Sequence, residues 1–110
     1  MGYNLFIDDE RFPPDDGRKW VIARSSEEAI SIFENQGVPD YISFDHDLGG
    51  DDTSMIYIDH LINLTLDLLS LNVEKWQIAF PRNYTVHSQN PVGARNINLK
   101  LQAFIKFLDQ

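Results

Sequence analysis

Four short apolar segments, each stopped abruptly by polar or charged residues, restrict the folds that this chain can adopt. They cover residues 4–7, 20–23, 41–44 and 84–86. Each is too short for a helix and is bounded by turn residues or charges, which is typical of buried strands. Since they are almost continuously apolar, both faces of the sheet that they form are expected to be covered.

Helical patterns separate these segments. Ser25 and Glu28 form a capping box at the start of the first predicted helix, and Gly37 supplies its left-handed end. A second helix is predicted from Thr53 to about Leu71, and a third from about Ala94 to Leu108. The alternation predicts a single α/β domain over residues 1–110, with a parallel sheet of about four strands and helices on both faces.

Composition excludes several classes of function. The chain has 110 residues and a net charge of −8, which argues against a broad electrostatic grip on double-stranded DNA or on an anionic membrane. It has no cysteine, which excludes disulfides, thiolate catalysis and cysteine-ligated metal sites. No apolar run approaches the length of a membrane span, and we read no signal peptide. These features predict a cytoplasmic protein.

Acids concentrate behind the first and third apolar segments. Nine of the 17 acids lie there: Asp8, Asp9, Glu10, Asp15, Asp16, Asp45, Asp47, Asp51 and Asp52. Converging carboxylates repel one another, and a divalent cation relieves that repulsion. Oxygen ligands without sulfur favour Mg²⁺ or Mn²⁺ over Zn²⁺. We therefore predict a metal site at the acids that directly follow the predicted strands. We interpret Asp15, Asp16, Asp51 and Asp52 as exposed turn residues. The predicted ligands are Asp8, Asp9, Asp45 and Asp47.

Basic and polar residues near the same strand ends are candidates for catalysis and phosphate binding. His87 follows the fourth apolar segment, and a histidine there can act as a general acid or base near neutral pH. Arg11 lies two residues after the first acid pair, and its guanidinium suits bidentate binding of phosphate. The loop after His87 adds Ser88, Asn90 and Gly93, the last placed to let backbone N–H groups face an anion at a helix start.

Two stretches, residues 21–30 and 39–45, resemble the middle of a response-regulator receiver domain. In receivers an acid pair after the first strand binds magnesium, and an aspartate after the third strand accepts phosphate. Asp8 and Asp9 match the pair, and Asp45 matches the acceptor. The resemblance implies a flavodoxin-like sheet with strand order 2-1-3-4. Only about ten residues separate Asp9 from the second strand, so the first receiver helix is expected to be missing, and no fifth strand with its lysine is evident.

Three further motifs together resemble a narrower group, the cyclic-phosphate-processing receiver-like domains of bacteria and their phages. They are residues 8–13 (DDERFP), 43–48 (SFDHDL) and 87–93 (HSQNPVG). The similarity extends from Leu5 to about Leu101. One departure is Ser54, where glycine is expected after the threonine. We expect it to alter the opening of that helix without touching the acids.

The resemblance implies a metal-dependent phosphoesterase that opens the cyclic phosphate of a nucleotide or an RNA end, with Asp45 and His87 as catalytic residues and Arg11 on the phosphate. Asp45 would help to hold the cation that activates water, or would act as a covalent nucleophile. His87 would be the general acid that protonates the leaving alkoxide. Three alternatives remain open at this point. They are a binder that sequesters a cyclic nucleotide signal, a phosphoacceptor module that signals through a partner, and a dehalogenase-like phosphatase suggested by the spacing of Asp45 and Asp47. The expected partner is a small phosphorylated ligand, and the sequence does not predict an oligomeric state. If a phage encodes the protein, the expected location is the host cytoplasm.

Overall fold

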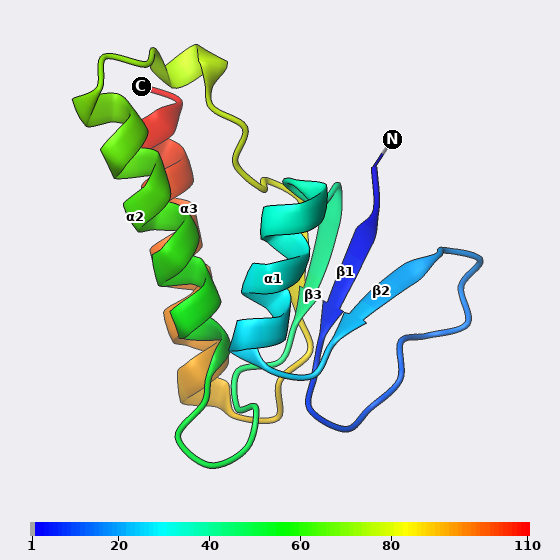
Figure 1. The fold of residues 1–110 in the computed structure, drawn as a ribbon. Coiled ribbons are helices and arrows are strands. Elements are labelled where there is room, and N and C mark those ends of the chain that lie inside the picture. The colour runs from blue at the N-terminus through cyan, green and yellow to red at the C-terminus, as the bar shows by residue number, and fades with distance from the viewer. Residues whose placement is uncertain (1) are drawn as a thin grey trace.

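The order of elements along the chain follows the predicted alternation of strands and helices. The structure is a computed structural model that describes residues 2–110. Its elements are β1 (Asn4–Ile7), β2 (Trp20–Ala23), α1 (Ser26–Gln36), β3 (Tyr41–Phe44), α2 (Ser54–Ser70), the short 3₁₀ helix η1 (Lys75–Gln77), β4 (Tyr84–Val86) and α3 (Pro91–Leu108) (Figure 1). No helix of residues 2–110 is long and apolar enough to cross a membrane.

The four strands form one sheet in the order β2-β1-β3-β4, and all neighbours are parallel. Both the parallel pairing and the order 2-1-3-4 confirm the prediction. The absence of a helix between β1 and β2 is also confirmed, because residues 8–19 form only loop and turn. The carboxyl ends of the strands therefore meet at one edge, shown at the bottom of Figure 1.

All three helices pack on the same face of this sheet. Leu5 and Ile7 of β1 and Ile42 and Phe44 of β3 share one buried cluster with residues of α1, α2 and α3. The opposite face carries Phe6, whose ring contacts Trp20 and His87 and none of the helices. The expectation of helices on both faces is therefore not met.

The hand of the crossovers explains this distribution. From β2 to β3 and from β3 to β4 the chain moves across the sheet in one direction, so right-handed connections place α1 and α2 on the same face. The connection from β1 to β2 runs in the opposite direction and would place its helix on the other face. That connection holds no helix, so the second face has no helical cover.

Side-chain caps determine where the helices begin. Ser25 accepts a hydrogen bond from the Glu28 N–H at the start of α1, as the capping box predicted. Thr53 caps α2 in the same way. Helix α3 begins at Pro91, three residues before the predicted start at Ala94, because Asn90 is its cap and proline suits the first helical turn.

Gly93 therefore lies in the first turn of α3 and is buried there against the loop that follows β3. A Cβ added to Gly93 would lie 2.3 Å from Cγ of His46, closer than two non-bonded carbon atoms can approach. Since the His46 side chain is itself mostly buried, at 13% exposed, it has little room to move away. The glycine is needed for this close packing between the β3 loop and α3.

We predict that Gly93→Ala lowers the free energy of unfolding by about 1–3 kcal/mol through overpacking against His46. Urea denaturation of the variant and of wild type measures the loss. The same substitution made in a His46→Ala background should cost little, because the clashing ring is gone. An equal cost in both backgrounds would rule out the contact as the cause.

Candidate functional site

The residues that follow β1, β3 and β4 extend the sheet by one position. The backbone N–H groups of Asp8, Asp45 and His87 donate to the carbonyl oxygens of Ala23, Ile7 and Phe44, at 3.1, 2.8 and 2.8 Å respectively. Because strand side chains alternate, these three point to the face opposite the helices. The sequence prediction that the strand ends bring acids and a histidine together is supported by this geometry.

Asp8 is the buried centre of the cluster, with no exposed surface. Its Oδ1 accepts from the backbone N–H groups of Glu10 and Arg11, at 3.0 and 2.9 Å. Its Oδ2 accepts from Nε of Arg11 and from Nε2 of His87, both at 2.9 Å. Four donors therefore converge on one carboxylate.

These contacts govern the protonation of Asp8. Burial by itself would raise the pKa of Asp8. The backbone N–H groups of Arg11 and Glu10, the His87 ring and the Arg11 charge outweigh that effect, and they hold the pKa below its ordinary value of 3.8. Asp8 is accordingly ionised at neutral pH.

Arg11 joins the first strand end to the third. Besides its bond to Asp8, its Nη2 lies 3.3 Å from Oδ2 of Asp45. The charges of the two carboxylates outweigh the effect of desolvation and raise the pKa of Arg11 above its ordinary value. The guanidinium thus supplies the positive charge between two acids that would otherwise repel each other.

Three of the four predicted metal ligands come together. Asp8, Asp9 and Asp45 each offer an oxygen, and these atoms lie within 4.8 Å of one another. The Asp9 carboxylate is exposed and makes no hydrogen bond or ion pair among residues 2–110. Three hard oxygen donors at this separation fit the predicted Mg²⁺ or Mn²⁺, whereas no nitrogen or sulfur ligand joins them to favour zinc.

The fourth predicted ligand, Asp47, lies outside this group. Its Oδ1 pairs with Nδ1 of His46 and its Oδ2 accepts from Nδ2 of Asn90, both at 3.0 Å. These two contacts lower the pKa of Asp47. In this arrangement Asp47 holds the loop after β3 against the loop after β4.

The ring of His87 has partners at both nitrogens. Nδ1 lies 2.7 Å from Oγ of Ser43, and Nε2 lies 2.9 Å from Oδ2 of Asp8. Since an ionised carboxylate can only accept hydrogen bonds, Nε2 of His87 carries the ring proton and donates a hydrogen bond to Asp8. The ring also stacks on Phe6, with centroids 4.6 Å apart and planes 4° apart. His87 is therefore fixed beneath Asp8.

The predicted phosphate contacts in the last loop have roles within the protein. Oγ of Ser88 accepts from the Asn90 N–H, and Oδ1 of Asn90 accepts from the Gly93 N–H, both at 3.0 Å. The Gly93 N–H is thus engaged by its own helix cap. A contact from these residues to phosphate stays a prediction.

An open cavity of about 420 Å³ lies over these side chains. It is lined by Asp9, Glu10, Arg11, Asp45, Asp47, Gly49, Gly50, Ser88, Gln89 and Asn90. Its volume is within the range of small-molecule sites. Six of the nine candidate residues reach its wall, and the buried Asp8, the partly buried His87 and the capped Gly93 do not.

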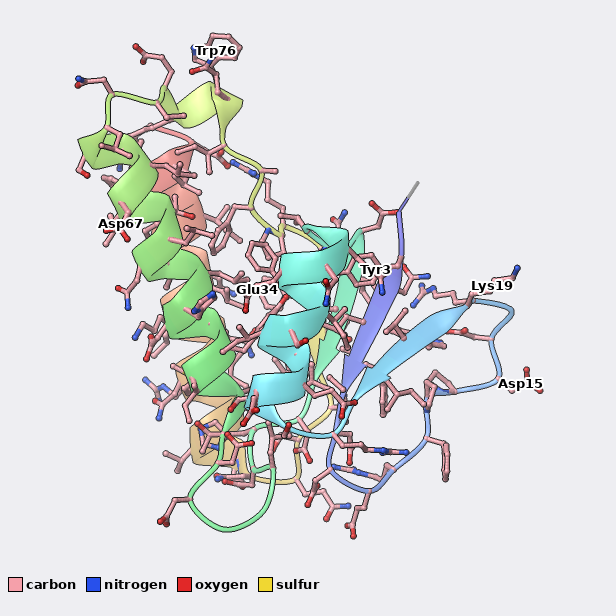
Figure 2. The ribbon with its side chains drawn as sticks, in the orientation of Figure 1. Tyr3, Asp15, Lys19, Glu34, Asp67 and Trp76 are labelled. Carbon is pink, nitrogen blue, oxygen red and sulfur yellow. The ribbon has the colours of Figure 1, made fainter. Side chains whose placement is uncertain are left out.

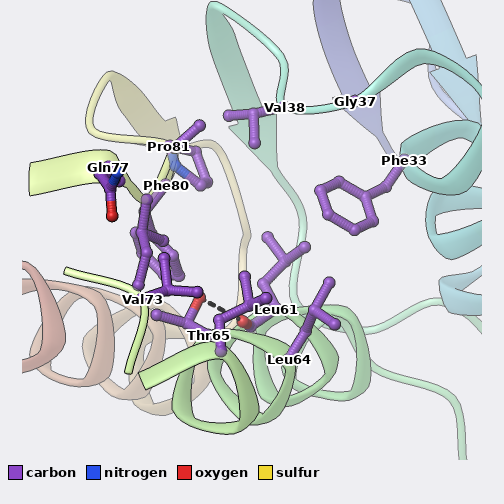
Figure 3. Close-up of a pocket in the computed structure, with 13 residues that line it drawn as sticks. Phe33, Gly37, Val38, Leu61, Leu64, Thr65, Val73, Gln77, Phe80 and Pro81 are labelled. Carbon is purple, nitrogen blue, oxygen red and sulfur yellow. Dashed lines mark hydrogen bonds between the residues drawn. The ribbon is translucent and has the colours of Figure 1, made fainter. Parts of the chain in front are cut away.

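A second cavity, of about 320 Å³, lies between α1, α2 and the segment before β4 (Figure 3). Its lining is almost wholly apolar and includes Phe33, Leu61 and Phe80. The hydroxyl of Thr65, one of its few polar groups, donates to the Leu61 carbonyl oxygen at 2.8 Å. With no ionisable side chain in its wall, this cavity offers no chemistry for phosphate.

Three residues that support the site were missed by the sequence analysis. Ser43 binds His87, and its position in an otherwise apolar strand, two residues before Asp45, was a usable signal. Arg24 directly follows β2, in the same position that Asp8 and Asp45 have after β1 and β3. Its Nη1 donates to the backbone oxygens of Asp8 and Arg11. Ser54, expected to leave the acids untouched, donates its hydroxyl to the backbone oxygen of Asp45.

We predict that Asp8→Asn destabilises the metal-free protein by about 1–3 kcal/mol at pH 7, because an amide cannot accept all four bonds. The pKa of Asp8 is lower in the folded state. The ionised Asp8 therefore contributes fully to the free energy of unfolding above the pKa of the unfolded state, near 3.8. This contribution is lost as the pH falls through the lower pKa of the folded state. Urea denaturation in EDTA at pH 7 and pH 3 should show the difference from wild type shrinking at pH 3.

Asp15→Asn, a change in the exposed loop before β2 (Figure 2), is the matched control and should have no such effect. A loss for Asp8→Asn that is the same at both pH values would contradict the assignment of this effect to the ionised carboxylate.

Comparison with known proteins assigns the chain to the family that its strand-end motifs resemble. The family model of the cyclic-phosphate processing receiver domain matches residues 3–103 of the chain. No curated protein and no solved structure matches it significantly. The matched region contains all four strands, the three acids and His87, and the chain belongs to the family of cyclic-phosphate processing receiver domains.

Proposed function

We propose that this protein is a metal-dependent phosphoesterase that opens a cyclic phosphate. The observation that carries the proposal is the group of three carboxylates within 4.8 Å of one another, bordered by Arg11, at the carboxyl edge of the sheet. In parallel α/β sheets this edge is where ligands bind. The family description supports a cyclic phosphate as the group that is processed.

Asp8, Asp9 and Asp45 would hold a Mg²⁺ or Mn²⁺ ion. When bound, such an ion neutralises phosphate oxygens and lowers the pKa of a water molecule. With a cation there, Arg11 is no longer needed to balance the charges of Asp8 and Asp45. Its guanidinium, with a side chain 40% exposed at the cavity wall, is then available to bind phosphate oxygens in a bidentate manner.

The reaction adds one water molecule. The water oxygen forms a new bond to phosphorus, and one of the two ring ester bonds from phosphorus to oxygen breaks. The water proton passes to a carboxylate, for which Asp45 at the cavity wall is the candidate, and the released alkoxide oxygen takes up a proton. The product is a phosphate monoester beside a free hydroxyl group.

His87 has a supporting role in this proposal. The sequence analysis assigned it as the general acid, but its protonated Nε2 is bonded to Asp8 and its Nδ1 to Ser43. A proton could leave Nε2 for the substrate only after the bond to Asp8 had broken. We therefore assign His87 as a positioning residue that keeps Asp8 ionised and oriented. The alkoxide takes its proton from water in the open cavity, and the hydroxide that remains takes up the proton that Asp45 had accepted.

We expect Mg²⁺ or Mn²⁺ to raise the melting temperature, since a ligand at a hundred times its dissociation constant stabilises the folded state by about 2.7 kcal/mol. Asp9→Asn should abolish the shift without changing the metal-free stability, because the Asp9 side chain makes no hydrogen bond or ion pair among residues 2–110. Asp51→Asn, in the exposed loop after β3, should keep it. Thermal melts with each metal and with EDTA measure this. The absence of a shift in wild type, or a full shift in Asp9→Asn, would contradict the site.

Two substitutions of His87 distinguish a positioning residue from a general acid. We expect His87→Gln, which retains an N–H donor for Asp8, to keep most of the turnover of a cyclic nucleotide, and His87→Ala to lose most of it. A general acid would instead cost 10²–10⁴-fold in both variants. Arg11→Ala should weaken ligand binding as well as turnover. Single-turnover hydrolysis beside calorimetric binding makes the comparison.

The first experiment is hydrolysis of a panel of 3′,5′- and 2′,3′-cyclic nucleotides with Mg²⁺ and Mn²⁺, read by product formation. Tight binding with quantitative recovery of the intact ligand would show that the protein sequesters a cyclic nucleotide and does not hydrolyse it. A phosphoacceptor role is less supported, because the described sheet has four strands and offers no fifth strand to present a lysine.

A further inference from the structure

An aromatic side chain stands exposed directly beside the phosphate-binding candidate. Phe12 follows Arg11 in the chain and is 78% exposed. Single exposed apolar residues are common on protein surfaces, so exposure by itself assigns no role. What distinguishes Phe12 is how its surroundings hold it.

The backbone on the amino-terminal side of Phe12 is attached to the candidate site. The Arg11 N–H donates to Oδ1 of Asp8 at 2.9 Å, and Nη1 of Arg24 donates to the carbonyl oxygens of both Asp8 and Arg11. Pro13 follows and restricts the backbone of Phe12 to extended conformations. The direction of the Phe12 side chain is therefore linked to the position of Asp8 and Arg11.

A cation lies over the ring of Phe12. The guanidinium carbon of Arg24 lies 5.0 Å from the centre of the Phe12 ring, within the range of a cation–π contact. Among residues 2–110 the Arg24 guanidinium forms no ion pair with an acid. Arg24 thus supports the ring from one side, and most of the ring surface remains open to solvent.

Other aromatic residues of the chain contrast with this arrangement. Trp20 and Tyr41, on the helix-free face, are partly buried and are covered by the guanidinium of Arg18. Trp76, on η1, is 82% exposed but lies at the end of the molecule opposite the strand ends (Figure 2). Phe12 alone of these combines a free ring with a position next to the candidate site.

We propose that Phe12, supported by Arg24, is a stacking platform for the nucleobase of the ligand whose cyclic phosphate binds at Arg11. The inference rests on the proposed function and narrows its substrate class to nucleoside cyclic phosphates. Consecutive Cα atoms are about 3.8 Å apart, so the two side chains can contact the phosphate and the base of one nucleotide. Bases of every kind stack on aromatic rings, so this contact selects for a base without specifying which one.

The test is calorimetric binding with Mg²⁺ of cyclic nucleotides and of matched probes that carry O-methyl in place of the base. A 3′,5′-cyclic nucleotide and a 2′,3′-cyclic nucleotide represent a signalling molecule and an RNA end, and each has its base-free counterpart. Wild type should bind one of the nucleotides about 5- to 100-fold more tightly than its counterpart, the usual effect of one stacking contact. Phe12→Ala should remove this preference and leave the affinity for the base-free probe unchanged, whereas Phe12→Trp should keep it.

Trp76→Ala is the matched control, because it removes an aromatic ring of similar exposure far from the site. It should bind every probe as wild type does, and circular dichroism should show all variants folded. Equal binding of nucleotide and base-free probe by wild type, or an unchanged preference in Phe12→Ala, overturns the platform and leaves the proposed function standing. Failure of wild type to bind any cyclic phosphate overturns the proposed function and the platform together.

Discussion

The site depends on one buried charge, the carboxylate of Asp8. A carboxylate with no exposed surface is unfavourable unless donors replace the water that it has lost. Here two backbone N–H groups, the guanidinium of Arg11 and the ring of His87 replace it. Each of those donors is thereby fixed in turn. Arg11 is directed toward Asp45, His87 is held between Asp8 and Ser43, and the turn after β1 is closed by its own N–H groups. Much of the site geometry thus follows from satisfying a single acid.

The loss of one crossover helix shapes the surroundings of that acid. Because side chains alternate along a strand, Asp8, Asp45 and His87 lie on the face that no helix covers. A helix between β1 and β2 would pack over this face and over the Phe6 and His87 rings. In its place residues 8–19 form a long loop. This loop positions Arg11 against the acids and leaves Phe12 exposed to solvent. The deletion that distinguishes this chain from ordinary receivers therefore also opens the side of the site from which a ligand larger than phosphate can approach.

The sequence was sufficient for the strands and for the three acids that converge, because short apolar segments followed by acids are local patterns. The strand order was predicted from the resemblance to receiver domains. Short apolar segments predict strands, and parallel strands place their ends together wherever the helices lie. It was insufficient for the cover of the second face. Apolar residues such as Phe6 suggested helices there, but aromatic stacking with His87 and Trp20 buries that ring instead. It also did not predict the partners of His87. His87 is bonded to Ser43 and Asp8, which precede it by 44 and 79 positions in the chain, so the sequence around His87 does not indicate its partners.

Charge balance in the site has two solutions, and the difference between them bears on mechanism. With Arg11 between Asp8 and Asp45, the charges of the two acids are balanced by a side chain of the protein itself. With a divalent cation among Asp8, Asp9 and Asp45, the same guanidinium is no longer required there. Asp9 separates the two solutions, because it takes part only in the second and makes no other hydrogen bond or ion pair among residues 2–110. An exposed acid without a structural role, beside a buried acid that is fully bonded, is the arrangement expected of a site that receives its cation from solution. Arg11 would then be released toward the phosphate at the moment when the cation arrives, which couples metal binding to substrate binding through one side chain.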